Sequence, residues 1–140
     1  MLSRDWILTT LVALSFGFGA VACASAQRPD PREEMSEAID DFHTHLVWGR
    51  YEDAAGYLPP GQRAHFVGVC QEIGDNIEYT EFDVGVINMD PVSEEVSVTV
   101  TLHWLDQNTL TLKQTRIEET WAMDPETEYW YIANRVSLDD

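Results

Sequence analysis

Residues 96–104, VSVTVTLHW, alternate between apolar and polar side chains at every position. The apolar set is Val96, Val98, Val100, Leu102 and Trp104, and the polar set is Ser97, Thr99, Thr101 and His103. A period of two residues is the repeat of a β-strand, whose successive side chains point to opposite faces of a sheet. The stretch therefore predicts a half-buried strand with one dry face.

Three other segments are predicted to be strands beside this one. The turn sequence Asp106-Gln107-Asn108 follows it, and strands are then expected over about 109–123 and 129–136, with a loop at 124–128 between them. An earlier strand is predicted over 77–88, where the alternation slips between Tyr79 and Phe82 and indicates a β-bulge. The four segments together predict an antiparallel meander.

The residues before the strands carry a helical pattern instead. The apolar positions of the first helix recur at steps of four and three: Met35, Ile39, Phe42 and Leu46. Gly49 ends or kinks this helix, and further helices are predicted over 51–58, stopped by PPG at 59–61, and over about 62–73. Helices followed by a meander predict an α+β domain whose helices pack on one face of the sheet.

Three short sequences resemble parts of the NTF2-like superfamily, which includes SnoaL-like and ketosteroid-isomerase-like proteins. They are GRYEDAA at 49–55, RIEETW at 116–121 and WYI at 130–132. The resemblance spans most of residues 35–136, and it implies a cone in which N-terminal helices pack on a curved antiparallel β-sheet. Because this fold serves both enzymes and non-catalytic modules, it implies no single activity.

The N-terminal residues predict an export segment. Residues 6–22 are apolar and end in small residues, which is typical of a signal peptide over 1–22. Ala20-Val21-Ala22-Cys23 resembles the lipobox of bacterial lipoproteins, and this implies that the Cys23 thiol receives a diacylglycerol. Cleavage after Ala24-Ser25-Ala26, leaving a soluble chain, is the first alternative, and an uncleaved anchor is the second. Residues 23–34 are predicted to be a polar tether and 35–140 the folded domain.

The net charge of the chain excludes some classes of binding partner. It has 8 Lys and Arg against 25 Asp and Glu, a net charge of −17. A surface this acidic repels nucleic acid and anionic lipid, so membrane attachment is expected only through the lipid anchor. Ala24 follows the lipidation residue where many inner-membrane lipoproteins have Asp, which favours an outer-membrane lipoprotein facing the periplasm or the surface.

No motif of a known catalytic, phosphate-binding or metal site is present in the sequence, so neither a cofactor nor a metal is expected. Asp41 and His45 are four residues apart and are expected to form an exposed acid–base pair rather than a metal site. Cys70 lies in an apolar stretch and is expected to be a core residue without a disulfide partner.

Four residues are candidates for lining a cavity inside the cone: Trp48, Tyr57, Glu119 and Trp121. Glu119 stands out because it shares strand parity with Ile117 and Trp121, on a face that is otherwise apolar. It must therefore be partnered, reach a wet cavity or be protonated, unless the strand bulges near Thr115 and leaves it in water at the sheet edge. In the cavity reading, Tyr57 or Trp48 is the expected hydrogen-bond donor.

These observations favour a non-catalytic binding or assembly module at the bacterial cell envelope, with an envelope protein or a small apolar ligand as its partner. The alternative is a small-molecule carrier, or a ketosteroid-isomerase-like or SnoaL-like enzyme, that uses the cone interior. The alternative to an outer-membrane location is a soluble periplasmic or secreted protein. The polar face of the strand at 96–104 suits a modest contact, and a monomer or weak homodimer is expected.

Overall fold

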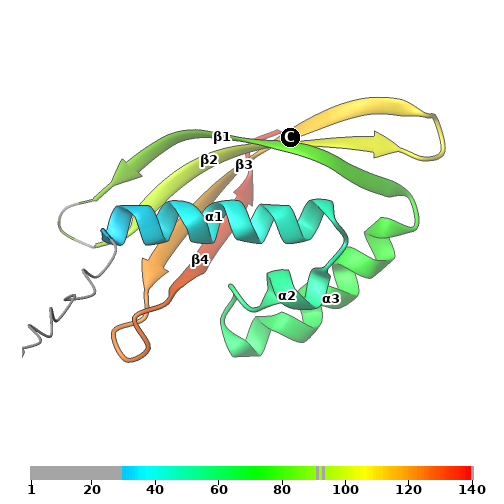
Figure 1. Ribbon diagram of the computed structural model, residues 1–140. Coiled ribbons are helices and arrows are strands. Elements are labelled where there is room, and N and C mark those ends of the chain that lie inside the picture. The colour runs from blue at the N-terminus through cyan, green and yellow to red at the C-terminus, as the bar shows by residue number, and fades with distance from the viewer. Residues whose placement is uncertain (1–29, 91, 93, 140) are drawn as a thin grey trace, which may run out of the picture.

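The computed structural model describes residues 30–90, 92 and 94–139, which form three helices followed by four strands (Figure 1). The helices are α1 (Pro31–Val47), α2 (Tyr51–Ala55) and α3 (Pro60–Gly74). The strands are β1 (Ile77–Met89), β2 (Val96–Asp106), β3 (Thr111–Met123) and β4 (Trp130–Ser137). The predicted signal peptide and Cys23 lie outside the described residues. None of the helices in the described part is long and apolar enough to cross a membrane.

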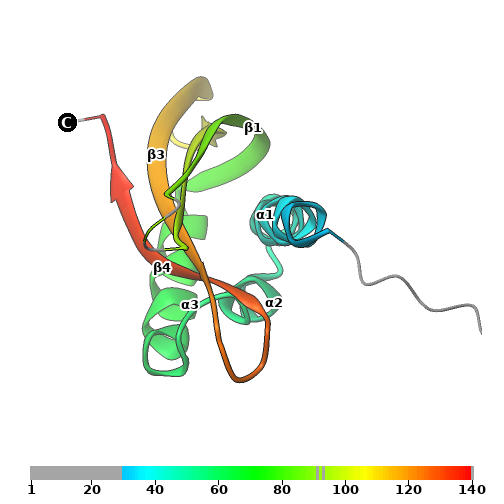
Figure 2. The ribbon, with the colours of Figure 1, turned by 90° about the vertical axis from the view of Figure 1, so that its left-hand side faces the viewer.

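The strands form one antiparallel sheet in the order β1-β2-β3-β4, so β1 and β4 are its edges. The sheet curves, and α1 crosses its concave side with α2 and α3 beneath (Figures 1 and 2). The predicted α+β class, with helices packed on a curved antiparallel sheet, is confirmed. The order of helices and strands along the chain was enough to predict this fold class, because each strand of the sheet pairs with the strand next to it in the sequence.

Irregular pairing accompanies the curvature of the sheet. The register of β1 against β2 shifts between Tyr79 and Glu81, which confirms the predicted bulge, and again between Val84 and Ile87. A further shift lies in the β3–β4 pair next to Trp121. A bulge adds a residue to one strand, bends it and increases its twist, so these positions favour a curved sheet rather than a flat one.

The core lies between β2, the middle of β3 and one face of α1. The apolar residues of β2 that were predicted to be dry are buried, and so is the predicted stripe of α1: Val96, Val98, Val100 and Leu102 with Met35, Ile39, Phe42 and Leu46. Trp121 and Ile132 complete this layer from β3 and β4. Cys70 is buried against the core, as expected.

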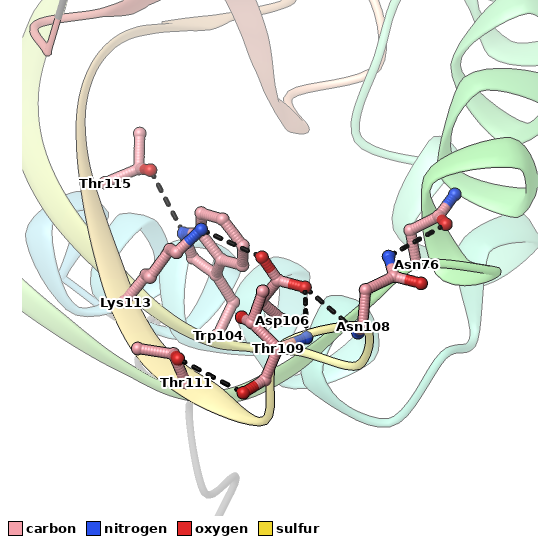
Figure 3. Close-up of polar contacts among 8 residues, drawn as sticks. All are labelled: Asn76, Trp104, Asp106, Asn108, Thr109, Thr111, Lys113 and Thr115. Atoms are coloured by element: carbon pink, nitrogen blue, oxygen red, sulfur yellow. Dashed lines mark hydrogen bonds and ion pairs between the residues drawn. The ribbon is translucent and has the colours of Figure 1, made fainter.

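The far end of the β2–β3 hairpin is held by polar contacts rather than by the core (Figure 3). Trp104 is only half-buried; its Nε1 donates to Thr115 Oγ1 at 3.1 Å, and Lys113 Nζ lies 5.1 Å from the ring centroid. Asp106 accepts hydrogen bonds from Lys113 Nζ and from the Asn108 backbone N–H. The Lys113 hydrogen bond is the main cause that lowers the pKa of Asp106 to about 2.

Helix α1 begins at Pro31, so the last four residues of the predicted tether are helical. Asp30 is its N-cap and accepts a hydrogen bond from the Arg32 backbone N–H at 3.0 Å. Proline is favoured in the first turn of a helix, where no intrahelical partner for its missing N–H is needed. The sequence before Met35 therefore starts the helix, four residues ahead of the predicted domain boundary.

Candidate functional site

Glu119 lies in the middle of β3 with its side chain 0% exposed, between the sheet and the helices. Its Oε1 accepts hydrogen bonds from Arg135 Nε at 2.9 Å and from His43 Nε2 at 3.1 Å. Its Oε2 accepts one from Trp121 Nε1 at 3.0 Å. The expectation of a bulge near Thr115 that leaves Glu119 in water is wrong, because β3 pairs with β2 without interruption there.

His43 reaches Glu119 from α1. It follows Phe42 on the buried stripe, four residues after Ile39, and its side chain is 0% exposed. His43 Nδ1 is 2.7 Å from the Ile39 carbonyl oxygen, which can only accept a hydrogen bond. Nε2 faces the Glu119 carboxylate, so both ring nitrogens face acceptors.

Arg135 reaches the same carboxylate from β4, where it is the direct cross-strand neighbour of Glu119. Its side chain is 25% exposed, so it extends from the solvent boundary into the interior. The guanidinium carbon lies 5.6 Å from the centroid of the Phe42 ring. Arg135 Nη2 is buried and has no hydrogen-bond partner in the part of the chain that the structure describes.

The pKa of Glu119 reflects two opposed effects. Burial is the largest and by itself raises the pKa, because it disfavours the charged form. The His43 hydrogen bond and the charges of His43 and Arg135, with the Trp121 hydrogen bond, outweigh it, so the pKa lies below its usual range. Glu119 is therefore a buried carboxylate with three donors on it. Such a group is a weak base, because each donor stabilises the charged form.

Aromatic rings surround this charged group and fill the space beside it. Phe42 is the centre of the cluster: its ring centroid lies 4.9 Å from that of His43, and 6.0 Å from those of both Phe66 and Trp121. The contacts with His43 and Trp121 are edge-on and the contact with Phe66 is tilted; such arrangements are typical of a packed core. The arrangement therefore joins α1, β3 and β4 by a buried ion network inside a packed aromatic layer.

The four residues predicted to line a cavity differ in burial and in their hydrogen-bond partners. Trp121 is fully buried and bonded to Glu119, and Tyr57 packs against Trp121 with ring centroids 6.0 Å apart. Tyr57 Oη donates to Asp41 Oδ2 at 2.6 Å rather than to Glu119; burial and this hydrogen bond raise the pKa of Tyr57. Trp48 is 74% exposed. The expectation that Tyr57 or Trp48 donates to Glu119 is therefore wrong.

Two partners of Glu119, His43 and Arg135, were not identified from the sequence. His43 had a usable signal, because Ile39, Phe42, His43 and Leu46 follow the i, i+3, i+4, i+7 spacing of a single helix face. Arg135 had none. In the β3–β4 register Trp121 pairs with Ile132 but Thr120 pairs with Asn134, so one residue is skipped and the inward parity of β4 changes before Arg135.

Other chemistry-bearing groups are few. Within residues 30–90, 92 and 94–139, no three His, Cys, Asp or Glu side chains are placed to hold a metal ion. Asp41 and His45 form the predicted acid–base pair, with Oδ2 and Nε2 3.3 Å apart. Burial raises the pKa of the Cys70 thiol to about 11, although the Arg135 charge opposes this. The thiol is therefore protonated and unreactive at neutral pH.

Comparisons with known proteins show similarity in fold and not in sequence. No protein-family model matches the chain, and no curated protein matches it. A ketosteroid isomerase-like protein from Erwinia carotovora atroseptica superposes with a TM-score of 0.61 at 8% identity, covering 81% of this chain and all of that one (100%).

Two further solved structures share the fold. Aln2 from a Streptomyces species gives a TM-score of 0.59 at 8% identity, with 79% of this chain and 90% of that chain covered. The intermembrane space region of the chloroplast protein ARC6 gives 0.51 at 12% identity, with 79% and 97% covered. At these identities the likeness concerns the backbone alone. The chain has an NTF2-like α+β fold.

Proposed function

We propose that this protein is an exported, lipid-anchored module of the bacterial cell envelope, and that its NTF2-like domain binds or assembles with a partner without catalysing a reaction. In this proposal Cys23 carries the lipid, and the residues between Cys23 and α1 separate the domain from the outer membrane. The partner is an envelope protein or a small apolar ligand, and no nucleic acid is bound. The acidity of the chain supports the last point, because like charges repel.

The state of Glu119 is the observation that supports a non-catalytic role. A general base has to reach its substrate and to have a pKa near the working pH. Glu119 and its partners His43 and Trp121 are each 0% exposed, and three donors lower the pKa of the carboxylate. Both features suit a group that fixes α1 on the sheet.

Fractionation of cells tests the location and the anchor. The Cys23→Ser variant is expected to move from the membrane fraction to the soluble fraction and to lose label from a radioactive fatty acid. Cys70→Ala, the matched control, removes the other cysteine and is expected to stay labelled and membrane-bound. A wild-type protein that takes up no fatty acid contradicts the lipid anchor. It then points to the soluble periplasmic or secreted location if the protein is found in the soluble fraction, and to an uncleaved anchor if it stays in the membrane fraction.

A carrier or enzyme that uses the cone interior is the second candidate, and one observation favours it. An imidazole and a carboxylate lie 3.1 Å apart inside the fold, which is a common pair in proton transfer. A ligand in the interior has to displace part of the aromatic layer. Its binding is therefore expected to shift the indole N–H resonance of Trp121 in a titration by nuclear magnetic resonance. An unchanged Trp121 resonance with a ligand bound elsewhere contradicts this candidate.

A further inference from the structure

A groove of about 840 Å³ runs between α1 and the hairpin that joins β3 to β4, two segments whose relative placement Figure 2 shows. One wall is a face of α1 from Glu34 to Thr44, a length of about 15 Å at the helical rise per residue. Gly56 and Tyr57, which follow α2, and Glu128, Tyr129 and Trp130 of the hairpin form the rest of the lining. This groove is separate from the buried Glu119 network.

The charge of the groove has a single sign. Five of its eleven lining residues are acidic, and none is Lys, Arg or His: Glu34, Glu37, Asp40, Asp41 and Glu128 are the acidic ones. Asp41 is engaged by Tyr57 and His45. Glu37 and Asp40 are exposed, Glu34 is half-buried, and none of the three has a charged partner among the residues whose positions are described. Carboxylates along one wall attract a cation, and the aromatic residues of the lining reduce the screening of that attraction.

Trp130 adds an independent observation that concerns hydrogen bonding. This residue lines the groove and a neighbouring hollow beside Leu58 and Asp124, and it is only 8% exposed. Its Nε1 is buried and has no hydrogen-bond partner in the described part of the chain. Buried donors are normally satisfied, so this indole lacks an acceptor that a bound molecule can bring. Because Nε1 is itself covered, a bound molecule reaches it only if the side chains over it move.

We propose that this groove binds an extended segment of a partner protein that carries lysine or arginine side chains. The basic side chains pair with Glu34, Glu37 and Asp40, and a backbone carbonyl of the segment accepts the hydrogen bond of Trp130 Nε1. An extended chain rises about 3.3 Å per residue, so four or five residues occupy the length of the groove. The inference rests on the proposed role as a binding module and names the chemistry of its partner.

The test uses the full-length protein in a non-ionic detergent and a defined probe, the acetylated and amidated peptide Lys-Ala-Lys-Ala-Lys labelled with fluorescein. The Glu37→Gln/Asp40→Asn variant is expected to weaken binding about tenfold, as loss of two close charge pairs implies. The control Glu81→Gln/Glu118→Gln makes the same change in net charge on exposed strand positions and is expected to bind as the wild type does.

Two further measurements separate this proposal from general attraction to an acidic protein. The peptide is expected to shift the indole N–H resonance of Trp130, whereas spermine, a polyamine that lacks carbonyl groups, is expected to bind more weakly and leave it in place. Equal loss of affinity in both double variants overturns the proposal, and so does the absence of peptide binding. Spermine binding as tight as the peptide overturns it in favour of a free polyamine. The Cys23→Ser fractionation is unaffected by any of these outcomes, so the two proposals fail separately.

Discussion

At the scale of single residues, Glu119 shows how a buried charge is kept in a core. Its carboxylate receives donors from α1, β3 and β4, so the same three hydrogen bonds that offset its burial also connect three elements. A buried ion pair of this kind contributes little net stability compared with a well-packed apolar core. Removing one partner is different, because the others then remain buried and unpaired.

Glu119→Gln tests this cost of removing one charged partner, because glutamine has nearly the same shape as glutamate but no charge. The substitution leaves His43 and Arg135 facing a neutral amide, and the free energy of unfolding at neutral pH is expected to fall by about 3 kcal/mol. Denaturation in urea followed by circular dichroism measures it. The control is Glu118→Gln, an exposed position on the preceding residue of β3, for which a change within about 0.5 kcal/mol is expected.

The same variant has a defined pH dependence. The pKa of Glu119 is lowered in the folded protein from its ordinary value of 4.5. Its stabilising contribution is therefore complete above about pH 4.5 and is lost as the pH falls through the folded-state pKa. Unfolding measured from pH 7 down to pH 2 is expected to show a flatter acid limb in Glu119→Gln than in the wild type. Parallel acid limbs in the two proteins contradict a lowered pKa.

At the scale of elements, the junction between α1 and α2 depends on one backbone conformation. Gly49 has a φ of +65°, its N–H donates to the Leu46 carbonyl, and the Arg50 N–H donates to the His45 carbonyl. These two bonds form a Schellman motif, which needs a left-handed residue where Gly49 stands. The motif turns the chain so that α2 follows directly after the helix carrying His43.

Gly49→Ala is expected to destabilise the fold by about 1 kcal/mol, because a side chain disfavours the left-handed conformation. Thermal unfolding measures it. Gly61→Ala is the matched control: a Cβ at either position meets nothing within 4 Å, but only Gly49 has a positive φ. The control is expected to be neutral or slightly stabilising, since alanine restricts the unfolded chain. Equal effects at both positions contradict the conformational explanation.

The helices and strands also show which buried positions could be predicted from sequence patterns and which could not. The alternation at 96–104 and the stripe of α1 predicted the buried faces correctly up to Leu102, because both depend only on local period; Trp104, at the end of the alternation, is only half-buried. The same strand parity placed Glu119 on the apolar face but left open a bulge that would expose it, and the uninterrupted pairing of β2 with β3 excludes that bulge. What parity missed was Arg135, whose inward position depends on a bulge that only the pairing of β3 with β4 reveals. Trp48 was misplaced for a related reason: it is the C-cap of α1, where the helical face no longer applies.

At the scale of the whole molecule, the net charge of −17 and the uncovered outer face of the sheet determine how copies meet. Helix α1 lies on the concave side of the sheet (Figure 2). The polar residues of β2, among them Thr99 and His103, point to the opposite face, where both are half-buried. His103 Nε2 is already bonded to Asp83 Oδ2 at 2.8 Å. A face of small polar residues offers little apolar area, and the net charge opposes association.

We therefore expect a monomer at low ionic strength and, at most, a weak homodimer through this outer face at high ionic strength. Raising the salt from 0.1 M to 1 M shortens the Debye length from about 10 Å to about 3 Å and removes most of the repulsion. Sedimentation equilibrium in both buffers measures the change.

Thr99→Asp places a charge at the centre of the face and is expected to abolish the dimer. Gln71→Glu, an equal change in charge on exposed α3, is expected to leave it. A stable large oligomer, or a dimer that tightens as salt is removed, contradicts association governed by repulsion between acidic surfaces.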